Sequence, residues 1–86
     1  MNGAINAGKL NMHELTFGTT TNNSFYGPAR SALDHSRSAG GSSGGSGGTV
    51  GTGVLPISLG IDAAGSIRIP ASSNGVIGYR PTVNRW

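Results

Sequence analysis

The sequence predicts an α/β fold class with glycine-rich loops. Three observations support this prediction: short apolar segments typical of strands, short segments of helical character between them, and 16 glycines among 86 residues. An average protein contains only roughly 7% glycine. A chain of this length holds one domain at most. With so much glycine and no cysteine, a core formed by this chain alone would be marginal, because glycine loses the most backbone entropy on folding.

The chain begins with a predicted strand and a predicted helical turn. Residues 4–10 alternate weakly between apolar and polar side chains, as a short strand does. Residues 11–15 predict one helical turn. Asn11 is its expected N-cap, and Glu14 lies three positions later, in the arrangement of a capping box.

The following segment predicts loops. Residues 16–28 are polar and end in a Gly-Pro pair, and we expect Phe25 and Tyr26 to anchor this loop in the core. Residues 29–39 predict a loop or a further helical turn.

The second half predicts short helices and strands in alternation. Residues 47–53 predict a helix against propensity, because each of their glycines costs about 1 kcal/mol relative to alanine. Residues 55–61 form the strongest strand pattern in the chain. Residues 71–75 predict a turn or short helix, and residues 76–79 predict a short strand that Pro81 ends.

Composition argues against several classes of function. The net charge is +3 and the six basic residues are spread along the chain, so we expect no direct nucleic-acid partner. No apolar run approaches the roughly 18 residues of a membrane span, and residues 1–4 lack the features of a signal peptide. We therefore expect no membrane partner and a cytoplasmic location. His13 and His35 lack ligand spacing, so we expect no metal site.

The glycine–serine stretch of residues 40–48 has two interpretations from composition: a flexible linker or a catalytic loop. A phosphate-binding loop is excluded, because no lysine follows Lys9. The linker interpretation is weakened because the flanks do not form separable domains. A second turn of small residues, carrying Ser66, also follows the strongest predicted strand.

Ser66 lies in a turn that suits a nucleophile. The backbone N–H groups of Ala63, Ala64 and Gly65 could converge beside it, as they do in an oxyanion hole. A serine hydroxyl also needs a base. A Ser-His-Asp triad that uses His35 is compatible with the composition alone, and an exposed histidine is the simpler interpretation.

Four stretches match a known family: GKLNMHEL at 8–15, GGSSGGS at 40–46, GIDAAGSIRIPA at 60–71 and GVIGYRPT at 75–82. Together they span residues 8–82, nearly the whole chain, and they resemble the amidase signature family. The resemblance implies a mixed sheet flanked by helices. It also implies that residues 1–86 are a partial amidase signature domain, truncated at both ends.

The resemblance implies a Ser–cis-Ser–Lys hydrolase. Ser66 matches the nucleophile, and Ser42 matches the relay serine, which follows a non-proline cis peptide bond in this family. Ser43 matches a supporting hydrogen-bonding position, and Asp62 and Arg68 have the spacing of a pair that braces the Ser66 turn. The oxyanion-hole backbone positions match Ala63, Ala64, Gly65 and Ser66.

The catalytic lysine of the family has no counterpart here. Lys9 is the only lysine, and its Gly-Lys-x-Asn-Met context is not the motif of the catalytic base. The resemblance implies no metal or organic cofactor.

The implied activity is hydrolysis of a small-molecule carboxamide to an acid and ammonia or an amine through a serine acyl-enzyme. Residues 11–14, 79–82 and 85–86 look most like members acting on free small amides such as indoleacetamide. Two alternatives stay open: a fragment of the amidase subunit of a glutamyl-tRNA amidotransferase, and a non-functional remnant. We expect the isolated chain to be inactive, and a homo-oligomer is compatible with the full-length enzyme.

Overall fold

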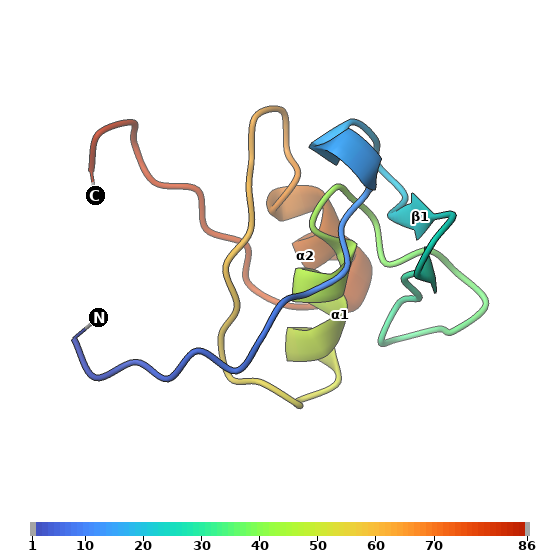
Figure 1. The fold of residues 1–86 in the computed structure, drawn as a ribbon, viewed down its shortest axis with the longest axis horizontal. Helices are drawn as coiled ribbons and strands as arrows, with labels where there is room; N and C mark the ends of the chain where they lie inside the picture. The colour runs from blue at the N-terminus through green and yellow to red at the C-terminus, as the bar shows by residue number, and fades with distance from the viewer. Residues whose placement is uncertain (1, 86) are drawn as a thin grey trace.

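The computed structural model describes residues 2–85. Met1 and Trp86 lie outside the described residues, and Trp86 is one of the residues on which the resemblance to small-amide hydrolases rests. The predicted α/β class is confirmed by a small antiparallel sheet and two helices. The elements in chain order are η1 (Glu14–Thr16), β1 (Asn22–Asn23), β2 (Gly27–Pro28), α1 (Gly44–Gly51) and α2 (Arg68–Asn74). Figure 1 shows α1 and α2 together at the centre, the β1–β2 hairpin on one side and both chain ends on the other.

Helix α1 begins at Gly44, earlier than the predicted 47–53. Its Ser43 N-cap makes no side-chain cap. Distant groups instead satisfy the first helical N–H groups: the hydroxyl of Thr21 accepts from Gly44, and the carbonyl of Asn11 accepts from Gly45. The start of this helix is therefore set by tertiary contacts rather than by a local capping sequence.

Glycines in α1 permit close packing on α2. A Cβ added to Gly47 would lie 2.8 Å from the Cβ of Pro70 and 2.9 Å from the side-chain nitrogen of Asn74. This approach offsets the low helix propensity of glycine, because it brings the two helices into direct contact.

Helix α2 begins at Arg68 rather than at the predicted residue 71. Pro70 lies within its first turn, where a missing N–H costs no intrahelical hydrogen bond. The helix ends at Gly75, whose φ of +68° is left-handed. The prediction of a short helix near residues 71–75 is thus confirmed, with an earlier start.

The predicted loop of residues 16–28 contains a hairpin in which Asn22 pairs with Pro28 and Asn23 with Gly27. The Asn23 side chain accepts the N–H groups of Phe25 and Tyr26 at 2.8 and 2.9 Å, which forms the turn. The prediction of these two aromatic residues as core anchors was wrong: they are 83% and 75% exposed. Their rings instead contact each other edge to face at 4.7 Å.

The strands predicted at residues 4–10, 55–61 and 76–79 do not form. These segments carry no strand pairing within residues 2–85. A strand needs a neighbouring strand along which its N–H and C=O groups pair, and the only strands described are β1 and β2. Figure 1 shows residues 55–61 as an extended segment beside the helices.

The predicted helical turn of residues 11–15 is replaced by η1 at Glu14–Thr16, with His13 at its N-cap. Asn11 does not cap it: its side-chain nitrogen donates to the carbonyl of Gly27, and its side-chain oxygen is buried without a partner among the described residues. Residues 29–39 form the predicted loop, closed by a bridge between Arg30 and Ser38.

Polar residues dominate the interior. Ala39, Pro70 and Ala71 are the buried apolar side chains among those described, whereas Ile57, Leu59 and Ile77 are largely exposed. The buried polar residues are Thr21, Ser31, Ser42, Ser43, Ser46 and Asn74. Neither helix described in residues 2–85 has the length and apolar character that a membrane crossing requires.

Candidate active site

Ser42 lies in the turn that precedes α1 and is completely buried. The Gly41–Ser42 peptide bond is cis, as the resemblance implied. The Ser42 carbonyl accepts the N–H of His13 at 2.9 Å and lies 3.2 Å from the hydroxyl of Thr21. The Ser42 hydroxyl itself has no hydrogen-bond partner among the described residues. Because buried hydroxyl groups are normally satisfied, this one is available to a group outside the described contacts.

Glycine is required beside Ser42. A Cβ on Gly41 would lie 2.8 Å from backbone atoms of Gly18, Thr19 and Thr20. Contacts this short with backbone atoms cannot be relieved by rotating a side chain. The glycine–serine stretch is therefore a tightly packed turn that leads into the first residues of α1, and the linker interpretation is wrong.

Ser66 lies in the turn that leads into α2 and is half-buried. Its carbonyl accepts the N–H of Ser43 at 3.1 Å, which brings the two serine-bearing turns together. The Ser66 hydroxyl forms no hydrogen bond within residues 2–85, so it is free to meet a substrate.

Ser43 connects the same two turns through its side chain. Its hydroxyl donates to the carbonyl of Ile61 at 3.3 Å and accepts the N–H of Ile61 at 3.2 Å. Ser43 thus joins the Ser42 turn to the residue immediately before Asp62.

Asp62 and Arg68 form the ion pair that their spacing predicts. Arg68 donates two bonds of 3.1 Å to the carboxylate, which also accepts the N–H groups of Gly65 at 2.7 Å and Ile67 at 3.2 Å. The Asp62 side chain is 1% exposed. The Arg68 guanidinium holds the pKa of Asp62 well below its usual range. Burial acts in the opposite direction, and the hydrogen bonds from the backbone N–H groups lower the pKa further. The Ser66 turn is therefore folded around the ionised carboxylate of Asp62.

The proposed oxyanion-hole residues have different surroundings. Ala63 and Ala64 are exposed, whereas Gly65 is buried and has a φ of +115°, which favours glycine. The Gly65 N–H is held by Asp62. Within the described part of the chain, the N–H groups of Ala63, Ala64 and Ser66 have no hydrogen-bond partner, so these three are the donors left free for an oxyanion.

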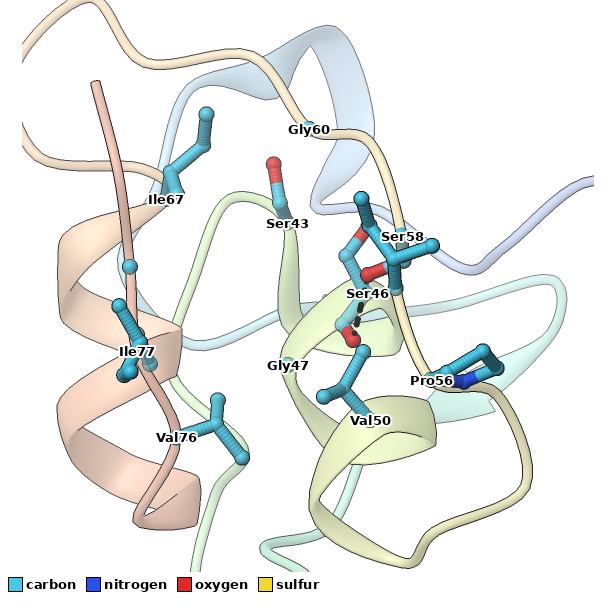
Figure 2. Close-up of a pocket in the computed structure, with 13 residues that line it drawn as sticks. Ser43, Ser46, Gly47, Val50, Pro56, Ser58, Gly60, Ile67, Val76 and Ile77 are labelled. Atoms are coloured by element: carbon cyan, nitrogen blue, oxygen red, sulfur yellow. Dashed lines mark hydrogen bonds between the residues drawn. The ribbon is translucent and has the colours of Figure 1, made fainter. Parts of the chain in front are cut away.

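A cavity of about 130 Å³ adjoins the site between α1, α2 and the segment of residues 56–60. Figure 2 shows Ser43, Val50 and Ile67 on its walls, and the hydrogen bond from the Ser58 hydroxyl to the Ser46 carbonyl at one side. Neither Ser42 nor Ser66 lines it. The cavity is therefore not the place where the two serines would meet a substrate.

The structure does not assemble a Ser-His-Asp triad. Among the described residues, no hydrogen bond or ion pair joins His35 to Ser66. Asp34 is occupied by Ser36 and Arg37 in the exposed loop beside His35. No cluster of three or more His, Asp or Glu side chains suited to a metal occurs in residues 2–85.

Two residues that hold the Ser42 turn carry no signal in the sequence. Thr21 and Asn74 are fully buried and bond to backbone groups distant in sequence. No local pattern marks either one, because their roles depend on which loop passes beside them.

Comparison with known proteins gives a consistent assignment. The amidase family profile matches residues 1–86. The chain is 51% identical over 84 residues to the indoleacetamide hydrolase of Pseudomonas savastanoi, covering 98% of this chain and 18% of that protein. It is 52% identical over 89 residues to the mandelamide hydrolase of Pseudomonas putida, covering 98% of this chain and 18% of that protein.

A solved structure also resembles this chain. One of the subunits of the glutamyl-tRNA(Gln) amidotransferase of Thermotoga maritima superposes with a TM-score of 0.83 at 47% identity, covering 87% of this chain and 17% of that one. The chain thus spans less than a fifth of the length of the relatives it matches. With the family profile matched over residues 1–86, the chain belongs to the amidase family.

Proposed function

We propose that residues 1–86 are the central catalytic segment of an amide hydrolase in which Ser66 is the nucleophile and Ser42 the proton relay. The observation that carries this proposal is the completely buried, unpartnered Ser42 hydroxyl, held in a turn that is bonded to the Ser66 turn. A structural serine in such a place would use its hydroxyl for a hydrogen bond. Ser43 does so in the next position.

The reaction follows from these positions. The Ser66 oxygen attacks the carbonyl carbon of a carboxamide, and its proton passes through the Ser42 hydroxyl to a base. The oxygen of the tetrahedral intermediate accepts hydrogen bonds from the free N–H groups of the turn at Ala63, Ala64 and Ser66. The proton then returns through Ser42 to the leaving nitrogen, and water releases the acid from Ser66. The base is a lysine supplied from outside residues 1–86.

The proposed substrate is a free small carboxamide of the arylacetamide type. Two of the relatives that match nearly all of this chain are named for indoleacetamide and mandelamide. We propose no cofactor, no direct nucleic-acid contact, a cytoplasmic location and a homo-oligomeric full-length enzyme.

A chimera tests the proposal. Residues 1–86 replace the matching segment of the Pseudomonas savastanoi indoleacetamide hydrolase, whose remaining chain supplies the missing parts of the domain. Ammonia release from indoleacetamide is then measured. We expect the chimera to turn over, Ser66→Ala to lower kcat by at least about 10³-fold, and Ser42→Ala to lower it by about 10²-fold or more.

Ser24→Ala is the matched control, because Ser24 is exposed in the hairpin turn and distant in the chain from both serines. It should leave kcat unchanged. Turnover that survives Ser66→Ala would reject the nucleophile assignment, and an unchanged kcat in Ser42→Ala would reject the relay.

The amidotransferase is the second candidate, favoured by the TM-score of 0.83 to the Thermotoga protein. In that case the segment would work within a complex that uses ammonia from glutamine. The same segment placed in the Thermotoga protein distinguishes the two. Glutamine-dependent activity there, together with an inactive hydrolase chimera, favours the amidotransferase.

The third candidate is a remnant without activity. The small apolar interior, limited to Ala39, Pro70 and Ala71 among the described residues, predicts that the isolated chain melts without cooperativity and has no hydrolase activity. Circular dichroism of the purified 86-residue chain measures this. A remnant would also leave the chimera inactive, whereas an active chimera excludes that candidate.

A further inference from the structure

We infer that Thr21 is a positioning residue that fixes the backbone around Ser42, so that the Ser42 hydroxyl stays available for proton transfer. This inference rests on the proposed function, because it assigns Thr21 a role in the Ser42 relay. Thr21 lies immediately before β1, and no local sequence pattern points to it.

The Thr21 hydroxyl is bonded to both ends of the turn that carries Ser42. It donates to the carbonyl of Gly40 at 2.7 Å and lies 3.2 Å from the carbonyl of Ser42. It also accepts the N–H of Gly44, the first residue of α1, at 3.0 Å. The side chain is completely buried, so water does not compete for these bonds. A single side-chain oxygen therefore spans the turn.

The backbone conformation of Thr21 is unusual for a threonine. Its φ is +49°, in the left-handed region that β-branched residues rarely adopt. Glycine or asparagine would fit that backbone more easily. Residues held in such conformations concentrate at functional sites, where the surrounding structure enforces them. Here the N–H of Ala29 also bonds the Thr21 carbonyl at 3.0 Å.

The consequence concerns where the Ser42 proton can go. A serine hydroxyl readily bonds to nearby backbone carbonyls, which would remove it from a relay. The carbonyl of Gly40 accepts the Thr21 hydroxyl, and the carbonyl of Ser42 accepts the N–H of His13 and lies 3.2 Å from the same hydroxyl. The Ser42 hydroxyl is consequently left unpartnered among the described residues. Thr21 thus acts on the reaction through Ser42 and touches no reacting atom.

The test uses the chimera described above with three substitutions. Thr21→Val keeps the shape and removes the hydroxyl, and Thr21→Ser keeps the hydroxyl. Thr52→Val is the matched control, because it removes an exposed threonine hydroxyl that bonds a backbone carbonyl at 3.0 Å at the end of α1. Each variant is assayed for kcat, for KM, and for the rate and final extent of Ser66 labelling by a fluorophosphonate.

We expect Thr21→Val to lower kcat and the labelling rate per reactive site by about 10- to 100-fold with KM nearly unchanged, since a small misplacement of a catalytic group has effects of this size. Thr21→Ser should stay within about threefold of the parent, and Thr52→Val should match it. A purely structural role would instead reduce the extent of labelling and leave the rate per labelled site unchanged, which would overturn the inference.

Two further outcomes are interpretable: a Thr21→Val variant that does not fold, and a failure of the proposed function itself. If Thr21→Val yields no folded protein, Thr21→Ser decides: parent-like kcat supports the hydroxyl, and a loss of about tenfold or more overturns it. Turnover that survives Ser66→Ala overturns the proposed function, and this inference with it. An active, Ser66-dependent chimera that is indifferent to Thr21→Val overturns the Thr21 inference alone.

Discussion

Asp62→Asn should destabilise the Ser66 turn far more than loss of its arginine partner. The buried carboxylate accepts the N–H groups of Gly65 at 2.7 Å and Ile67 at 3.2 Å. Hydrogen bonds to a charged acceptor contribute roughly 1.5–3 kcal/mol each, so losing the charge at two of them costs about 3 kcal/mol. The Arg68 side chain is 56% exposed. Solvent therefore partly screens its ion pair, and Arg80 still lies 3.7 Å from the same carboxylate when Arg68 is lost, so Arg68→Gln should cost less.

Urea denaturation of the chimera measures both free energies of unfolding. Asp34→Asn is the matched control, because its carboxylate lies in an exposed loop and pairs with Arg37. It should change stability little. A loss below about 1 kcal/mol in Asp62→Asn would refute the reasoning, since surface substitutions have effects of that size. An equal loss in Arg68→Gln would refute it as well.

The pH dependence of the free energy of unfolding gives an independent test of the role of Asp62. Arg68 is the main cause of the lowered pKa of Asp62 in the folded state. A carboxylate with a depressed pKa contributes stability that is complete above its unfolded pKa, about 3.9, and that is lost as the pH falls from there toward the folded value. The difference between the parent and Asp62→Asn should therefore be constant from about pH 5 to 8 and shrink below about pH 4. A difference that changes near neutrality would contradict the assignment.

Three further substitutions test the packing around the helices. Gly48→Ala should raise stability by about 1 kcal/mol through helix propensity, because its nearest neighbour, the carbonyl of Arg30, would lie at an ordinary 3.5 Å. Gly47→Ala should instead lower the melting temperature, because the new Cβ would lie 2.8 Å from Pro70; a stabilised variant would contradict this close helix contact. Asn74→Leu should cost about 3 kcal/mol, because it removes three hydrogen bonds to backbone groups, two of them buried; a neutral effect in urea denaturation would show that these bonds contribute little.

Local chemistry explains why part of the site was predictable. Asp62 and Arg68 lie in one short turn, so their spacing was enough to predict the pair that the structure shows. Gly75 ends α2 where a residue with left-handed φ is needed. The resemblance placed a cis peptide before Ser42, and the structure has it. The catalytic roles of Ser42 and Ser66 stay predictions until the substitutions are made.

Non-local contacts explain what was missed. Residues 55–61 have a strong strand pattern, yet no strand among residues 2–85 pairs with them. The side chains of Ser43 and Ser46 bond the backbone of this segment instead. The hairpin at residues 22–28 had a local signal, because the Asn23 side chain bonds the N–H groups of its turn. The polar residues around it were interpreted as an irregular loop. The start of α1 depends on Thr21 and Asn11, whose bonds no local sequence window contains.

The sequence alone determined the two serines with their small neighbours, the spacing of Asp62 and Arg68, and the presence of a single lysine. These follow from residue identity and short spacing. The tertiary structure alone decided that the glycine–serine stretch is a packed turn and that the Ser42 hydroxyl is buried without a partner among residues 2–85. It also showed that Thr21 spans that turn. The physical reason is that burial and hydrogen-bond partners depend on which distant segments pass beside a residue, and sequence spacing does not contain that information.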